Sequence, residues 1–345
     1  MGRPRYLLIT LSSGTVPSDT SYIIVMEWPT WRYVDVLKCR HKVYEYSFKG
    51  FAGAAVDENK LLVTREAEIL VINLCPLFIE DVITKKYFND LHHITCSEDS
   101  IIVTNSGLDC IEIFDKKLDH RKSIFLSPFF RSDVKYLWWF FRHAIRKSWR
   151  KRKDNSLYQH LNRRVPFPNV MKYLSPPGLH RSDYDLRYFD LRPHFVHPNH
   201  VTVIGEALWV TLWGPGVILR IPDGRTLASG LGHPHDGIVR DSEYFVTDCK
   251  DSKLMVFDMN GHLPTKMKLS KRLMPANGPG FVRGIEVWKN KIFVGLSTLR
   301  GHGKFPFARI LEIDRRSGEI EKEHIIPKEY GTSIYSIIDV TKYYI

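Results

Sequence analysis

The chain has 345 residues, of which 43% are hydrophobic and 12% aromatic; this is enough apolar side chain for a large core and excludes a disordered chain. Its 50 Lys and Arg against 38 Asp and Glu give a formal net charge of +12, which indicates an acidic partner such as nucleic acid or an anionic membrane surface. No apolar stretch is long enough to cross a membrane, and the apolar run near the N-terminus is too short for a signal peptide. We expect a cytoplasmic monomer whose five cysteines are small buried thiols.

In chain order, the predicted strands form a repeated unit. Each unit has a short apolar strand, a polar turn and a second strand that ends in Val-Thr or Val-Gly, which is the pattern of a β-hairpin. A third strand and a fourth, more polar strand follow, and four antiparallel strands in about 40 residues are typical of a propeller blade. The units align without gaps over 50–64, 89–104, 196–211, 232–247 and 280–295.

The two ends of the chain complete one further blade. Residues 333–341 are predicted to form an innermost strand, and residues 6–10 supply the second strand that this blade needs. Residues 22–27 supply the third strand, and either 32–38 or 43–48 the fourth. Closing the ring in this way removes exposed sheet edges. We therefore predict an all-β fold: a single six-bladed β-propeller over 1–345, with the N-terminal strands closing the last blade.

A segment is inserted between the second and third blades, over 129–193. Val103 and Val210 hold the same place in successive units, yet the spacing between them is much longer than elsewhere. Over 134–153, apolar residues recur every three or four positions with Lys and Arg mostly opposite, which predicts a basic amphipathic helix. The insert is interpreted as a lid packed on the propeller, as a peripheral contact with an anionic membrane, or as a contact with nucleic acid. Nucleic acid is the least favoured partner because no binding motif accompanies the charge.

The aligned units also predict which residues meet at the propeller axis. Innermost strands line the central channel of a propeller, so residues at equal offsets in different blades converge there although they are distant in sequence. The first set lies eleven residues before the Val of each Val-Thr or Val-Gly and comprises Ala52, His92, Asn199, His235 and Arg283. The second set follows one residue later: Gly53, His93, His200, Asp236 and Gly284. The third set lies two residues before the first: Gly50, Asp90, His197, His233 and Phe281.

The density of imidazoles in these sets suggests chemistry at the axis. The preferred metal ligands are His92, His93, His200 and His235, with His197 and His233 as second choices, and the expected cofactor is a divalent Fe, Zn or Mn ion. The same groups can act instead as acid and base, with His235, Asp236 and Arg283 catalytic, and with Arg283 and Asn199 binding substrate; the catalytic role of Arg283 is to stabilise developing negative charge. A purely structural alternative has the imidazoles bonded to loop carbonyls around a water channel.

The strand starts resemble those of known propeller families. His235-Asp236-Gly237-Ile238 resembles the starts seen in streptogramin-lyase, gluconolactonase and NHL-repeat proteins, and the segments 90–93 and 197–200 are similar to those of a family of bacterial propellers. The gluconolactonase resemblance implies a calcium site made by Glu, Asn and Asp. Asn199 and Asp236 match part of this set, but no Glu occupies the equivalent position at the start of another innermost strand. The streptogramin-lyase resemblance implies a histidine base with magnesium, at His235. Iron-binding propellers suggest an oxygenase.

Two functional classes follow. The first is a metal-dependent propeller enzyme, a lyase, hydrolase or oxygenase, that acts on a small molecule at the mouth of the central channel. The second is a non-catalytic scaffold that binds a protein partner or an anionic membrane through its channel face and basic insert.

Overall fold

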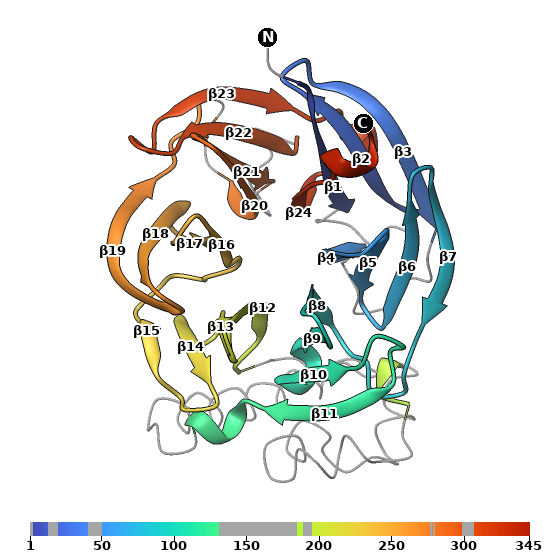
Figure 1. Ribbon diagram of the computed structural model, residues 1–345, viewed down its shortest axis with the longest axis vertical. Helices are drawn as coiled ribbons and strands as arrows, with labels where there is room; N and C mark the ends of the chain where they lie inside the picture. The colour runs from blue at the N-terminus through green and yellow to red at the C-terminus, as the bar shows by residue number, and fades with distance from the viewer. Residues whose placement is uncertain are drawn as a thin grey trace, which may run out of the picture.

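The computed structural model describes residues 3–12, 20–40, 50–130, 185–188, 195–276, 278, 280–298 and 307–345. These residues form six four-stranded antiparallel sheets arranged around a central axis (Figure 1). The predicted six-bladed β-propeller is therefore confirmed. Along the described ranges the helical elements are short 3-10 turns, at Ser106–Leu108, Ser127–Phe130, Leu186–Tyr188, Lys328–Tyr330 and Thr341–Tyr343.

Blades 1 to 5 follow one another along the chain, each running from its innermost to its outermost strand. Blade 1 contains β4 (Phe51–Asp57), β5 (Lys60–Arg65), β6 (Glu68–Leu74) and β7 (Leu77–Ile83). Blade 2 contains β8 (Leu91–Cys96), β9 (Ile101–Asn105), β10 (Cys110–Phe114) and β11 (His120–Phe125). Blade 3 contains β12 (Pro198–Ile204), β13 (Ala207–Leu212), β14 (Val217–Ile221) and β15 (Thr226–Ala228). Blade 4 contains β16 (Ile238–Arg240), β17 (Glu243–Asp248), β18 (Lys253–Asn260) and β19 (Leu263–Arg272). Blade 5 contains β20 (Phe281–Trp288), β21 (Lys291–Ser297), β22 (Arg309–Asp314) and β23 (Ile320–Ile325).

Blade 6 joins the two ends of the chain, as predicted. Its innermost strand is β24 (Ser333–Asp339), followed by β1 (Arg5–Ser12), β2 (Thr20–Trp28) and β3 (Arg32–Arg40). The pairing of β24 with β1 places Ile337 opposite Ile9, and an ion pair of 2.9 Å joins Arg5 to Asp339. The fourth strand is thus the earlier of the two candidate segments, and 43–48 lies outside the described residues.

The core lies between neighbouring blades, and the strand sequences reflect this. Second strands are covered on both faces, so they are buried along nearly their whole length: all five residues of β9, Ile-Ile-Val-Thr-Asn, are buried. Outermost strands are covered on one face only, and β3 accordingly alternates between exposed and partly buried positions. This contrast is the expected result of a two-residue side-chain period in a strand that meets water on one face.

The predicted insert is described only at its edges. The amphipathic helix expected over 134–153 lies outside the described residues, and its proposed contact with a membrane therefore stays a prediction. Of the helices in the described ranges, none is long and apolar enough to cross a membrane.

Candidate functional site at the propeller axis

The innermost strands are irregular at the same height in every blade. Their pairing with the second strand shifts register at the residues of the first and second sets, and in blade 4 the ladder breaks between Pro234 and Ile238. In the other five innermost strands, the shift lies between the two residues of each of these pairs: Phe51/Ala54, Leu91/Ile94, Pro198/His200, Arg283/Ile285 and Ile334/Ser336. A β-bulge adds a residue to one strand and redirects its side chains. The bulges therefore form a ring of redirected side chains around the axis.

The threonine of each Val-Thr pair supports this ring. Thr104 accepts the backbone N–H of His93 at 2.7 Å, and Thr247 accepts that of Asp236 at 3.2 Å. The hydroxyl of Thr211 donates across blades, to the carbonyl of His235 at 2.9 Å. These threonines are fully buried, and their hydroxyls satisfy backbone groups that the bulges remove from the regular ladder. The repeated Val-Thr pair therefore identifies the residues that support the ring, as well as the end of the second strand.

Blade 6 adds two residues that the sequence alignment missed. Tyr335 belongs to the first set and Ser336 to the second, because the N–H of Ser336 bonds to Thr10 at 3.0 Å, as the N–H of His93 bonds to Thr104 in blade 2. The signal was present in the sequence: Ile9-Thr10 matches the other Val-Thr pairs, and its partner strand carries the ring residues. Tyr335 is 4% exposed and lies against Arg283.

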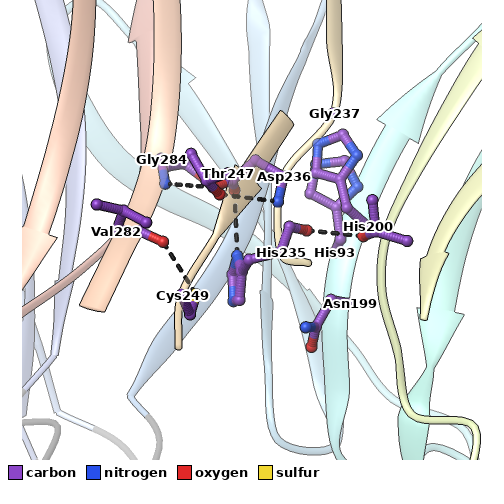
Figure 2. Close-up of polar contacts among 12 residues, drawn as sticks. His93, Asn199, His200, His235, Asp236, Gly237, Thr247, Cys249, Val282 and Gly284 are labelled. Carbon is purple, nitrogen blue, oxygen red and sulfur yellow. Dashed lines mark hydrogen bonds and ion pairs between the residues drawn. The ribbon is translucent and has the colours of Figure 1, made fainter. Parts of the chain in front are cut away.

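The predicted residues divide between two sides of the ring. Figure 2 shows the imidazoles of His93 and His200 pointing to one side, and the imidazole of His235 and the amide of Asn199 to the other. We call the second of these the start side, because the third set, which precedes the ring in each strand, lies there. The opposite side is called the channel side.

On the start side, His92 lies at the centre of a group of rings. Its centroid is 4.8 Å from that of His235, 5.3 Å from that of His197 and 6.0 Å from that of Tyr335. Nδ1 of His197 is 4.0 Å from Oδ2 of Asp90. This group joins first-set and third-set residues from four blades, as the alignment predicts.

His233 and Asn199 are held by other contacts on this side. His233 stacks on Trp213, with centroids 4.2 Å apart and an angle of 13° between the ring planes. Asn199 donates from Nδ2 to the carbonyl of Pro234 at 2.8 Å. Among the described residues, its Oδ1 has no hydrogen-bond partner although it is buried, so Asn199 retains an acceptor at the ring.

On the channel side, the imidazoles of His93 and His200 are in contact, with centroids 3.5 Å apart and an angle of 31° between the ring planes. Burial lowers the pKa of His93 to about 3 and lowers the pKa of His200 well below its ordinary value. Both rings are therefore neutral at physiological pH.

The four preferred metal ligands are consequently two pairs on opposite sides of the ring. His92 and His93 face opposite sides, since His92 contacts His235 and His197 on the start side and His93 contacts His200 on the channel side. Within the described ranges, no group of three or more His, Cys, Asp or Glu side chains has the arrangement to hold a metal ion. The described histidines do not form the single metal centre that the sequence suggests, and bound Fe, Zn or Mn stays a prediction.

Asp236 is the most firmly held group at the ring. Its Oδ2 accepts the hydroxyl of Thr247 at 2.6 Å and the N–H of Gly284 at 3.0 Å, and its Oδ1 lies 3.2 Å from Nδ1 of His235 (Figure 2). A carboxylate only accepts hydrogen bonds, so this contact places the proton of a neutral His235 on Nδ1. The lone pair of His235 is then on Nε2, as a general base requires.

Arg283 places a cation beside the imidazoles. Its guanidinium lies 4.9 Å from the ring centroid of Tyr335 and 5.5 Å from that of Phe281, and the residue is partly exposed. Burial opposes its charge, but Tyr335 and Cys249 raise the pKa of Arg283 above its ordinary value. Burial also raises the pKa of Cys249 to about 12, which keeps that thiol neutral. No carboxylate of the described residues forms an ion pair with Arg283, so its charge is available to an anion.

Comparison with known proteins adds to the description of the fold. No protein-family model and no curated protein sequence matches this chain. Among solved structures, the chain is similar to one in a nidogen/laminin complex, with a TM-score of 0.56 and 13% identity over 96% of this chain and 97% of that chain.

Two lactonase structures are also similar. The periplasmic gluconolactonase of Pseudomonas aeruginosa has a TM-score of 0.53 and 10% identity over 98% of this chain and 99% of its own. A putative 6-phosphogluconolactonase of Bacteroides fragilis has a TM-score of 0.50 and 10% identity over 98% of each chain. At these identities the likeness concerns the fold alone. By its own strand pairing the chain is a six-bladed β-propeller, and these likenesses support the propeller fold.

Proposed function

We propose that this protein is a propeller hydrolase that opens a small anionic lactone or ester on the start side of the ring. His235 is the general base, Asp236 orients it, and Arg283 binds the anionic group of the substrate. The observation that carries the proposal is the 3.2 Å contact between His235 Nδ1 and Asp236 Oδ1, made by a carboxylate that Thr247 and Gly284 already hold in place.

The reaction uses one water molecule. Nε2 of His235 takes a proton from the water while its oxygen bonds to the carbonyl carbon of the substrate. The bond from that carbon to the lactone ring oxygen, or to the ester oxygen, then breaks, and this leaving oxygen takes the proton from His235. The negative charge of Asp236 stabilises the imidazolium between the two transfers, as in other histidine–carboxylate pairs.

The neighbouring residues suit an anionic, hydroxylated substrate. Arg283 is a guanidinium without a carboxylate partner among the described residues, and guanidinium binds carboxylate or phosphate through paired N–H donors. The buried Oδ1 of Asn199 is an acceptor for a substrate hydroxyl. The substrate-binding roles predicted for Arg283 and Asn199 are therefore retained in the proposal. No step passes through a metal ion, because the described histidines lie on two sides of the ring.

The test is hydrolysis of glucono-δ-lactone and 6-phosphogluconolactone, probes taken from the names of the two similar lactonases, followed by acid release at constant pH. We expect hydrolysis above the uncatalysed rate, faster for the phosphorylated lactone. His235→Gln should lower kcat by about 100-fold or more, whereas His262→Gln, at an exposed position, should match the wild type. Equal rates with and without the protein for both lactones contradict the proposal, and activity that appears only with added Fe, Zn or Mn favours the metal-dependent enzyme instead.

A further inference from the structure

A second feature of the axis lies on the opposite side of the ring from the imidazole of His235 (Figure 2). The channel side contains a cavity of about 300 Å³, at the lower end of the volumes of ligand pockets. Its walls are the continuations of the innermost strands beyond the ring, and they are mainly aliphatic: Ala54, Ala55, Val56, Ile94, Val203, Ile238, Val239, Ile285, Ile337 and Ile338. His93, His200, Asp236 and Ser336 lie at the ring end of the cavity. Arg240 and Glu286, which form an ion pair of 3.3 Å, also line it. The cavity thus combines aliphatic walls with a polar end at the ring and one ion pair.

The contacts of His200 determine its tautomer. Thr202 donates its single hydroxyl proton to the carbonyl of Gly237, so its oxygen can only accept from Nδ1 of His200, 3.2 Å away. The neutral ring therefore carries its proton on Nδ1, and Nε2 is an acceptor.

His93 has the opposite tautomer. Its Nδ1 accepts the backbone N–H of Val201 at 3.5 Å, so the proton of the neutral ring is on Nε2. In the described part of the chain, neither Nε2 makes a hydrogen bond, and both rings line the cavity. Two imidazoles with centroids 3.5 Å apart therefore offer one donor and one acceptor side by side.

The charges around the cavity restrict what it can accept. The carboxylate of Asp236 lines its ring end and repels an anionic ligand, whereas Glu286 is paired with the guanidinium of Arg240, which also lines the cavity. The oxygens of Asp236 already accept hydrogen bonds from Thr247, Gly284 and His235. The aliphatic walls and the neutral imidazoles do not replace the hydration of a cation. An uncharged ligand satisfies both conditions, with an apolar body against the walls and a head that accepts from His93 and donates to His200.

We propose that the channel-side cavity is a binding site for a small neutral molecule with an aliphatic body and a primary carboxamide head. The carboxamide oxygen accepts from Nε2–H of His93, and its N–H donates to Nε2 of His200. This site and the proposed hydrolase site lie on opposite sides of the same ring and share only the carboxylate of Asp236 among the residues assigned to them.

The probe is hexanamide, with hexanoate and hexylamine as charged probes of the same length, titrated by calorimetry. We expect the wild type to bind hexanamide at least about tenfold more tightly than either charged probe. The ring nitrogens of His93 and His200 should shift in histidine ¹⁵N NMR spectra on addition of hexanamide, while those of His235 stay unchanged.

Two variants separate the head from the body of the site. His200→Phe keeps a ring but removes the acceptor, and should weaken hexanamide binding by about tenfold or more; His262→Phe, the same change at an exposed position, should not. Ala55→Phe fills the cavity and should abolish binding, which keeps the test decisive if His200→Phe does not fold. Absence of hexanamide binding to the wild type, equal affinity for hexanoate, or full affinity in Ala55→Phe would each overturn the proposal. None of these outcomes depends on lactone hydrolysis.

Discussion

Nδ1 of His235 lies 3.2 Å from Oδ1 of Asp236, the next residue in the chain. Adjacent residues of a regular strand point to opposite faces and do not meet in this way. The contact exists because residues 235–237 form the break in the ladder of blade 4 and because Thr247 turns the Asp236 carboxylate back along the strand. The bulge at the ring is thus the local structure that produces the proposed catalytic pair.

Asp236→Asn should lower kcat for lactone hydrolysis by about 1,000-fold with little change in KM. The amide can donate to Nδ1 of His235, which would then present a proton on Nε2 where a base is needed. Steady-state kinetics measure the effect. The matched control is Asp241→Asn in an exposed turn, and an Asp236→Asn enzyme with wild-type kcat would remove Asp236 from the mechanism.

Arg283→Gln should raise KM for 6-phosphogluconolactone by about tenfold or more while changing KM for glucono-δ-lactone less, because the guanidinium is assigned to the anionic group. Competition by inorganic phosphate should weaken in parallel. Arg240→Gln serves as the control, since Arg240 is paired with Glu286 beside the channel-side cavity. Equal losses for both lactones would point to a structural role for Arg283.

Thr104→Val should lower the free energy of unfolding by about 1–3 kcal/mol, because the buried N–H of His93 loses its acceptor. The two side chains have nearly the same shape, so packing changes little. Urea denaturation provides the measurement. The control Thr265→Val, at an exposed position, should change stability by less than about 0.5 kcal/mol, and a similar small effect at Thr104 would show that the ring does not need the threonine hydroxyl.

Stability should fall as the pH drops below about 6.5. His93 has a folded-state pKa of about 3, lowered by burial, so between these values the unfolded chain binds a proton that the folded chain excludes. The stabilisation is present above the unfolded pKa and is lost at about 1.4 kcal/mol per pH unit below it. Urea denaturation at several pH values should show a shallower slope in His93→Gln than in wild type or His262→Gln. Identical slopes in all three proteins would mean that His93 is not held neutral.

Metal content distinguishes the acid–base proposal from the metal-dependent enzyme expected from the sequence. Because the four preferred ligands His92, His93, His200 and His235 form two pairs on opposite sides of the ring, we expect well under one equivalent of Fe, Zn or Mn by mass spectrometry, and lactone hydrolysis that persists after treatment with EDTA. About one equivalent of metal, lost in a folded His92→Ala/His200→Ala/His235→Ala variant, would contradict this and restore the metal centre.

The blade repeat, the number of blades and the closure by both termini could all be predicted from sequence. Each depends on short-range patterns: polar turns such as Asp241-Ser242, two-residue alternation, and strands that end in Val-Thr. Turn geometry and strand alternation are properties of a few consecutive residues, so they are visible without the tertiary structure. The same repeat correctly placed His92, Asn199, His235 and Arg283 in one ring, because equal offsets in equivalent strands lead to equal heights on the axis.

The side of the ring that each side chain faces was decided by the tertiary structure. At a bulge the simple alternation fails, and the direction of a side chain depends on a hydroxyl supplied by another strand, as Thr247 does for Asp236. The lack of a carboxylate partner for Arg283 among the described residues and the neutral pair His93–His200 likewise depend on what six separate blades bring to the axis. Such contacts join residues that are tens or hundreds of positions apart, and no local pattern in the chain encodes them.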